Sequence, residues 1–233
     1  MALILNIETS SSVCSVCISR DREVILKKED FSGTNHASML AVFIQQLFQE
    51  TKIGMKDLDA IAVSAGPGSY TGLRIGVVTA KGLCFSLDKP LIAIDSLQAL
   101  ASGLEKKIPV PGTHDGKGNL IYCPTIDARR NEIYFGLYGR EGEEILPSHN
   151  IILSSSIPFS IPDGHTVVAG GSGVLKCRQA WGDEPILYDD SVVSSARHMT
   201  FLSQKKFTVS MFEDIHSFEP HYIKPVYINT PRS

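Results

Sequence analysis

The chain lacks an apolar run long enough to cross a membrane, and it lacks a basic N-terminal region followed by a cleavage site. A spanning helix needs about 20 consecutive apolar residues, and every apolar run here is much shorter. The first residues instead enter a strand pattern from Ala2 to Ile7. We therefore expect a cytoplasmic protein that does not associate with membranes.

An excess of charge of one sign is also missing. The 233 residues carry 22 Lys and Arg against 25 Asp and Glu, which gives a formal net charge of −3. The basic pairs Lys27-Lys28, Arg129-Arg130 and Lys205-Lys206 lie far apart in the sequence. A protein that binds nucleic acid by itself carries a clustered basic surface, so we expect no such surface here.

Metal-ligand motifs are absent as well. Cys14 and Cys17 have CxxC spacing, but they lie in an alternating strand pattern. Residues three apart on a strand point to opposite faces, so the two thiols cannot hold one metal ion. No histidine has a partner at a helical or hairpin ligand spacing together with a third ligand. The sequence predicts buried free thiols and no metal site.

The strongest motif is the stretch from Ser64 to Gly76, in which a strand leads through Gly66-Pro67-Gly68 into a helix. Such a turn can cradle phosphate with backbone N–H groups. However, no Gly-Lys-Ser/Thr follows it, and the GxGxxG spacing is missing. The helix also carries small residues every four positions, a ridge typical of close helix packing. These residues are Gly72, Gly76, Ala80 and Cys84.

Hydrophobic periodicity predicts an α/β protein of two lobes. Strands are expected at 2–8, 13–19, 23–29, 58–64 and 90–94, and helices at 37–50, 71–87 and 96–104. A loop rich in Gly and Pro, within 109–119, predicts the boundary between lobes 1–108 and 109–233. The second lobe is expected to contain strands at 120–127, 132–138, 144–146 and 166–169 and a short helix from 174. The tail 219–233 contains three prolines and is expected to be partly extended and peripheral.

The two predicted lobes begin alike, which indicates a duplication with a cleft between the halves. Glu8 and Asp127 each end a first strand just before a polar turn. Across a cleft they could hold Mg²⁺ or position a nucleophile, while Gly66, Gly68, Gly170 and Gly171 could contact a nucleotide. Alternatively, the acids bond to their own turns and the glycines only allow tight corners. The sequence leaves both interpretations open.

Several segments together resemble the TsaB (YeaZ) family, whose members are subunits for the biosynthesis of threonylcarbamoyladenosine in bacterial tRNA. The resemblance is carried by Asn6-Ile7-Glu8-Thr9-Ser10, Gly66–Gly76, Ala80-Lys81-Gly82-Leu83, Lys89-Pro90-Leu91-Ile92 and Ile126-Asp127-Ala128-Arg129. It is strong over residues 3–137 and loose beyond them. Glu8 stands where the family more often has Asp, and Tyr70 stands where Phe is usual.

The resemblance implies an actin-like, Hsp70-type ATPase (ribonuclease H-like) fold of two lobes, each with a mixed sheet flanked by helices. It also implies a non-catalytic partner of the enzyme TsaD, which transfers threonylcarbamoyl to adenosine 37 of tRNA, in a complex that the ATPase TsaE joins. Transfer RNA would be bound only through the complex. The catalytic relatives carry two metal-binding histidines where this chain has Ser96 and Leu100, and a leucine cannot bind a metal ion.

We therefore expect a partner surface on helices 37–50 and 71–87, both of which are apolar over much of their circumference. The same surface is expected to form a homodimer when the partner is absent. The predicted interface residues are Leu40, Phe43, Ile44, Leu47, Gly72, Gly76, Ala80 and Cys84. No cofactor is expected to bind tightly, which leaves ATP or ADP with Mg²⁺ at low affinity or at the subunit interface. The competing hypothesis is a nucleotide-dependent transferase or phosphohydrolase that uses Glu8 and Asp127.

Overall fold

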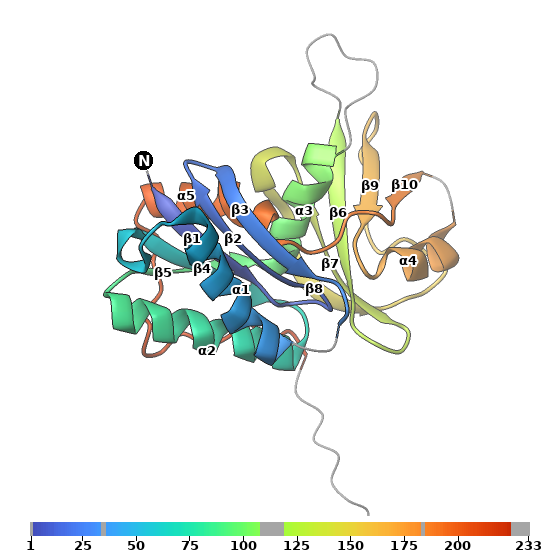
Figure 1. The fold of residues 1–233 in the computed structure, drawn as a ribbon. Coiled ribbons are helices and arrows are strands. Elements are labelled where there is room, and N and C mark those ends of the chain that lie inside the picture. Colours follow the sequence, from blue (N-terminus) through green and yellow to red (C-terminus); the bar gives the residue numbers. More distant parts are fainter. Residues whose placement is uncertain (1, 34–35, 108–118, 183–184, 225–233) are drawn as a thin grey trace, which may run out of the picture.

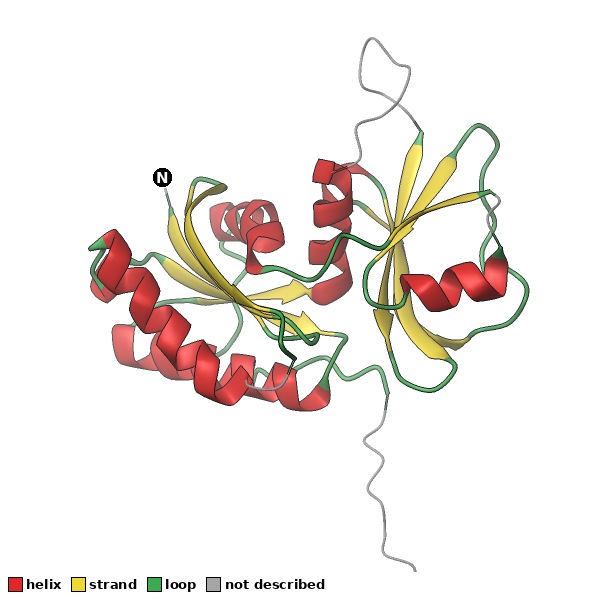
Figure 2. Ribbon diagram, turned by 45° about the vertical axis from the view of Figure 1, so that its right-hand side comes forward, coloured by secondary structure: helices red, strands yellow, loops and turns green. Residues whose placement is uncertain are grey.

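The computed structural model describes residues 2–33, 36–107, 119–182 and 185–224. Two lobes, each built on one five-stranded sheet, lie side by side (Figures 1 and 2). Within these residues, no helix combines the length and apolar character that a membrane crossing requires.

The first sheet has the strand order β3-β2-β1-β4-β5. β1 (Leu3–Glu8), β2 (Cys14–Arg20) and β3 (Glu23–Asp30) form an antiparallel meander. β4 (Ala60–Gly66) and β5 (Leu91–Asp95) run parallel to β1. Parallel neighbours need crossover connections, which are supplied here by α1 (His36–Thr51), followed by the turn η1 (Met55–Asp57), and by α2 (Tyr70–Leu87).

The second sheet repeats this topology in the order β8-β7-β6-β9-β10. Its antiparallel strands are β6 (Leu120–Asp127), β7 (Glu132–Tyr138) and β8 (Glu144–Ile152), with the short turn η2 (Arg140–Gly142) before β8. β9 (Thr166–Gly170) and β10 (Ile186–Asp189) run parallel to β6, and α4 (Val174–Trp181) connects them. The predicted two-lobed α/β architecture with mixed sheets is confirmed.

The helices form layers around the two sheets (Figure 1). Alternate residues of β1 point to opposite faces, as strand geometry requires: Leu3, Leu5 and Ile7 pack under α1 and α2. Ile4 faces the short helix η3 (Ala196–Met199) and α5 (Thr200–Thr208). α3 (Ser96–Lys107) packs between the lobes, against both β5 and β6. α4 covers the far face of the second sheet.

The chain returns to the first lobe after β10, which corrects the predicted assignment of all of 109–233 to the second lobe. α5 packs on β1 and β5, and the Glu213 N–H donates to the Leu91 carbonyl (2.9 Å). Met199 and Leu202 are buried in the same core as Ile4. The predicted boundary loop lies almost entirely outside the described residues, as does the tail beyond residue 224.

Candidate functional site

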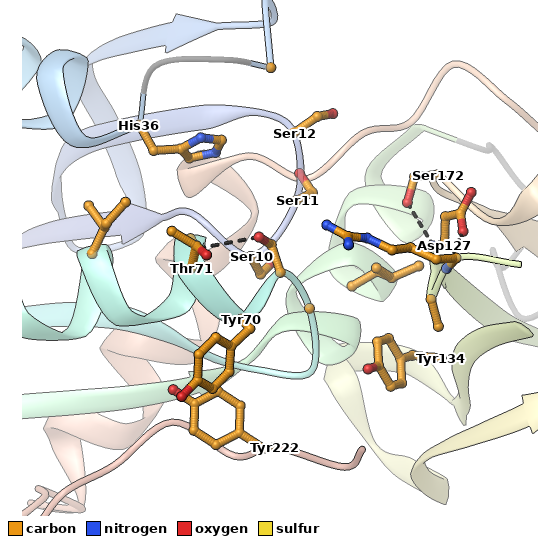
Figure 3. A pocket seen from close by; sticks show the side chains of 18 of the residues that line it. Ser10, Ser11, Ser12, His36, Tyr70, Thr71, Asp127, Tyr134, Ser172 and Tyr222 are labelled. Carbon is orange, nitrogen blue, oxygen red and sulfur yellow. Dashed lines mark hydrogen bonds between the residues drawn. The ribbon is translucent and has the colours of Figure 1, made fainter. Parts of the chain in front are cut away.

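A cleft of about 1070 Å³ lies between the lobes (Figure 3). On the first lobe its wall is formed by the β1–β2 turn at Ser10–Ser12 and by the first residues of α1 and α2. The second lobe supplies the end of β6, Tyr134 and Ser172, and the chain segment 221–224 completes the lining. The cleft predicted from the duplicated lobes is therefore present.

The glycine-rich turn before α2 is packed against the β1–β2 turn. The Ser69 N–H donates to the Ser10 carbonyl (2.6 Å), and the Ser69 side chain caps α2 by accepting from the Gly72 N–H (3.3 Å). A Cβ atom on Gly68 would lie 2.2 Å from the Ser10 carbonyl oxygen, and one on Gly72 would lie 2.1 Å from that of Thr9. Protein backbone thus occupies the space beside these glycines.

Protein atoms also fill the space beside Gly66 and beside the glycine turn of the second lobe. Gly66 has φ +111°, and a Cβ atom there would lie 2.5 Å from the His221 carbonyl oxygen. A Cβ atom on Gly170 would lie 2.4 Å from the Leu104 side chain, and one on Gly171 would lie 2.3 Å from the Thr125 carbonyl oxygen. Of the four glycines predicted to contact a nucleotide, only Gly68 lines the cleft. These close approaches favour the structural interpretation of the glycines.

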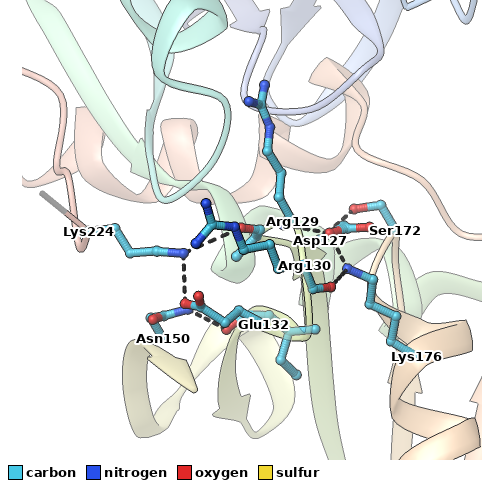
Figure 4. A network of polar contacts seen from close by, with 10 residues as sticks. Asp127, Arg129, Arg130, Glu132, Asn150, Ser172, Lys176 and Lys224 are labelled. Carbon is cyan, nitrogen blue, oxygen red and sulfur yellow. Dashed lines mark hydrogen bonds and ion pairs between the residues drawn. The ribbon is translucent and has the colours of Figure 1, made fainter. Parts of the chain in front are cut away.

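The two predicted carboxylates are in different environments. Glu8 is 1% exposed, does not line the cleft, and accepts the Ser10 N–H (2.6 Å). Burial raises its pKa, because a charged carboxylate is disfavoured away from water. Asp127 lines the cleft, accepts the Arg129 N–H (2.7 Å) and pairs with Lys176 (2.6 Å) (Figure 4). Of the two interpretations that the sequence left open, these contacts favour the second, in which each carboxylate bonds to its own turn.

The small-residue ridge of α2 faces the protein core, which contradicts its predicted role as a partner surface. A Cβ atom on Gly76 would lie 2.2 Å from Thr9 Oγ1 and 3.4 Å from Val63. The apolar stripe of α1 packs into the same core between the helices and the sheet. All eight predicted interface residues are buried within the chain: Leu40, Phe43, Ile44, Leu47, Gly72, Gly76, Ala80 and Cys84.

The opposite face of α2 is open. Val78 and Phe85 are 70% and 73% exposed, and a Cβ atom on Gly82, which lies between them, would meet nothing within 4 Å. α1 contacts α2 on the same side of the sheet, and its sequence contains no Asp, Glu, Lys or Arg from residue 37 to residue 49. The exposed sides of the two helices thus lie next to each other and form one surface with exposed apolar side chains, which we call the α1–α2 outer face.

The two charged side chains of α2 lie one turn from Val78, at i−4 and i+3 on the helix surface, and each has a contact of its own. The Arg74 guanidinium lies over the Tyr70 ring (4.4 Å). Lys81 donates to the backbone carbonyls of His216 (3.3 Å) and Phe218 (2.9 Å). Apolar side chains that are exposed in a row are typical of a protein-binding surface.

Sequence reasoning did not identify Asp95, which connects the lobes. Its carboxylate accepts the Gln98 N–H (2.8 Å) and caps α3. It also accepts from Tyr138 (3.2 Å) and Ser148 (2.9 Å) of the second lobe. Burial raises the pKa of Asp95. An acid before a predicted helix indicates a cap, but only the folded structure shows its partners in the other lobe.

No cluster of three metal-binding side chains occurs in the described part of the chain. Ser96 and Leu100, which the family resemblance places where catalytic relatives would carry metal-binding histidines, are each 1% exposed and packed into the protein. Neither side chain suits a metal ion as imidazole does.

Comparison with known proteins gives consistent results. Residues 30–154 match the family model of TsaD, tRNA N6-adenosine threonylcarbamoyltransferase. The tRNA threonylcarbamoyladenosine biosynthesis protein TsaB of Bacillus subtilis (strain 168) is 30% identical over 232 residues, covering 95% of this chain and 93% of the relative.

Two solved structures share the fold. The crystal structure of a Pseudomonas aeruginosa protein with similarity to peptidase YEAZ has a TM-score of 0.81 and 24% identity, covering 96% of this chain and all of that one. Component A of the Acidaminococcus fermentans (R)-2-hydroxyglutaryl-CoA dehydratase has a TM-score of 0.51 and 9% identity, covering 91% of this chain and 100% of that one. The predicted actin-like ATPase fold is confirmed.

Proposed function

Because the chain belongs to the TsaB (YeaZ) family of tRNA threonylcarbamoyladenosine biosynthesis proteins, we propose that it is a non-catalytic subunit that binds and supports a TsaD-type threonylcarbamoyltransferase. The α1–α2 outer face is the proposed contact. The observation that carries this proposal is the exposed strip of Val78, Gly82 and Phe85 beside the stretch 37–49 of α1, which contains no Asp, Glu, Lys or Arg.

The physical reason is the free energy of desolvation. Burying apolar surface is favourable by about 25 cal/mol per Å². Gly82 leaves room for a partner side chain or backbone to approach the helix closely. The same surface is proposed to form a homodimer when the enzyme is absent, because a helix pair can bind a second copy of itself about a two-fold axis.

The non-catalytic part of the proposal is supported by the residues at the positions of the relatives' metal ligands. Ser96 and Leu100 are buried in the chain and cannot supply a Lewis acid for acyl transfer. We further propose that a TsaE-type ATPase and tRNA join only when the enzyme is bound. ATP or ADP is proposed to bind weakly to the chain alone or at the subunit interface, a proposal supported by the closed packing beside the glycine turns.

The test uses Phe85→Asp in a reconstituted reaction with the TsaD-type enzyme, the TsaE-type ATPase and tRNA. The matched control is Leu175→Asp on α4, since Leu175 is also an exposed apolar helix residue (58%) but lies in the second lobe. We expect Phe85→Asp to lose co-purification with the enzyme and to reduce threonylcarbamoyl transfer to the level seen without this chain, while Leu175→Asp behaves like the wild type. Equal binding by both variants would refute the surface. Full transfer without this chain would refute the function.

A further inference from the structure

The described C-terminal segment, residues 213–224, runs from the first lobe to the second. We propose that this segment, the C-terminal strap, holds the two lobes at one angle through Lys224, so that releasing Lys224 opens the cleft. This inference concerns the chain alone and does not depend on the proposed partner.

The strap is attached to the first lobe along most of its length. Ile215 and Phe218 pack against the core beneath α1 and α2. Lys81 of α2 donates to the carbonyls of His216 and Phe218. Farther along, the His221 N–H donates to the Ala65 carbonyl (2.7 Å) at the end of β4.

Tyr222 adds a contact with the first turn of α2. Its ring lies 4.8 Å from that of Tyr70, centroid to centroid (Figure 3). Aromatic pairs at this separation contribute about 0.5–1.5 kcal/mol beyond their buried area. Apolar packing, backbone hydrogen bonds and this ring pair therefore keep the strap on the first lobe whenever the lobes move.

The attachment to the second lobe is of another kind. Lys224 Nζ pairs with Glu132 (2.7 Å) at the start of β7 and donates to the Ala128 carbonyl (3.4 Å) in the β6–β7 turn. Both charged side chains are 20% exposed, so water screens them only partly. The contact with Lys224 lowers the pKa of Glu132, which keeps that carboxylate charged. Among the described residues, Lys224 makes the hydrogen bonds and ion pairs that join the strap to this lobe.

The position of this contact lets it restrain rotation of one lobe relative to the other. The lobes are also joined through α3 and Asp95, and residues 221–224 line the cleft itself. Figures 1 and 2 place α3 between the sheets and the described end of the strap below it. A link that spans the cleft at a distance from the α3 contacts opposes rotation of one lobe about the other.

A second lysine provides a matched control. Lys176 pairs with Asp127 (2.6 Å) and donates to the Arg130 carbonyl (2.7 Å), so it contacts the same β6–β7 turn from the other side (Figure 4). Both of its ends lie in the second lobe. Lys176→Met therefore removes an equivalent ion pair without detaching the strap, whereas Lys224→Met detaches it.

The experiment measures the distance between spin labels on the full chain, at Gln49→Cys in α1 and Ile152→Cys in β8. The five native cysteines are buried, so labels attach to the introduced thiols. We expect Lys224→Met to shift the interlobe distances to longer values with a broader distribution, and Glu132→Gln to do the same from the other side of the pair. Lys176→Met should match the wild type.

The same measurement on the wild-type chain tests the ion pair without any substitution that could unfold the protein. High salt shortens the Debye length to a few ångströms and should move the wild-type distances toward those of Lys224→Met. Unchanged distances in Lys224→Met, or an equal shift in Lys176→Met, would overturn the proposal. Circular dichroism of each variant separates opening of the lobes from loss of the fold.

Discussion

The two glycines at positions 76 and 82 of α2 are expected to respond in opposite ways to the same substitution. Gly76→Ala places a methyl group 2.2 Å from Thr9 Oγ1, whereas Gly82→Ala places one in open space. Carbon atoms in contact prefer a separation of about 3.5–4.0 Å. One helix thus contains both the perturbation and its matched control.

The magnitudes follow from packing and helix propensity. Overpacking a core costs about 1–3 kcal/mol. We take the upper end, because Thr9 is fully buried and its β-branched side chain has few rotamers. Alanine returns about 1 kcal/mol of helix propensity relative to glycine. We therefore expect Gly76→Ala to destabilise the fold by about 2 kcal/mol and Gly82→Ala to stabilise it by about 1 kcal/mol.

Thermal and urea unfolding of the isolated chain measure both changes. For a chain of this size, 1 kcal/mol shifts Tm by about 2–4 °C, so Gly76→Ala should lower Tm by about 4–8 °C and Gly82→Ala should raise it by about 2–4 °C. Thr9→Ala removes the clashing oxygen and should recover part of the loss in the double variant. Similar effects at both glycines would show that the ridge faces outward, contrary to this packing.

Two further predictions concern charge. Burial lowers the pKa of His198 to about 3. Between pH 6.5 and pH 3, His198 is therefore protonated in the unfolded chain but neutral in the folded chain. The free energy of unfolding should fall over this range as the pH is lowered, by about 2 kcal/mol at pH 5. Urea titrations at pH 7 and pH 5 should show a smaller difference for His198→Gln than for the wild type, and equal differences would contradict this assignment. Calorimetry with ATP and Mg²⁺ should give weak heats that Asp127→Asn leaves unchanged, because Asp127 is paired with Lys176 and Glu8 is buried away from the cleft. Tight binding that Asp127→Asn abolishes would instead support the nucleotide-dependent enzyme.

The fold was predictable where apolar residues recur with a clear period. The strands and helices of the first lobe lie within a few residues of their expected bounds, because their apolar residues recur with the period of a strand or of a helix. β8 extends to Ile152, well past its expected end at residue 146. The expected strand was too short because Pro147, His149 and Asn150 interrupt the alternation of apolar and polar residues. An edge strand tolerates such residues, since one side of it makes no ladder hydrogen bonds. β10 and α5 were missed because four and nine residues are too few to show a period.

The candidate site was harder to predict, because periodicity identifies a face without saying what covers it. α2 carries apolar residues around most of its circumference, so its sequence does not show which of two faces packs against the core. The small residues face the core in the structure. Thr9 packs so closely against Gly72 and Gly76, through its backbone and side chain respectively, that a Cβ atom at either position would clash with it. The larger Val78 and Phe85 were left outside. The strap was missed because its contacts join residues more than 90 positions apart in the sequence.

The duplicated lobes explain why equivalent positions carry different chemistry. Glu8 and Asp127 both end the central strand of a five-stranded sheet with the same topology. In the first lobe, the β4–α2 turn packs on the β1–β2 turn through Gly68 and covers the carboxylate, so burial favours its protonated form. In the second lobe Asp127 lines the cleft, and Lys176 pairs with its charge. A pair that holds Mg²⁺ needs two charged carboxylates reaching one ion. Here Glu8 is buried and Asp127 is paired with Lys176, which is why we propose the helix face of the first lobe, rather than its strand ends, as the functional surface.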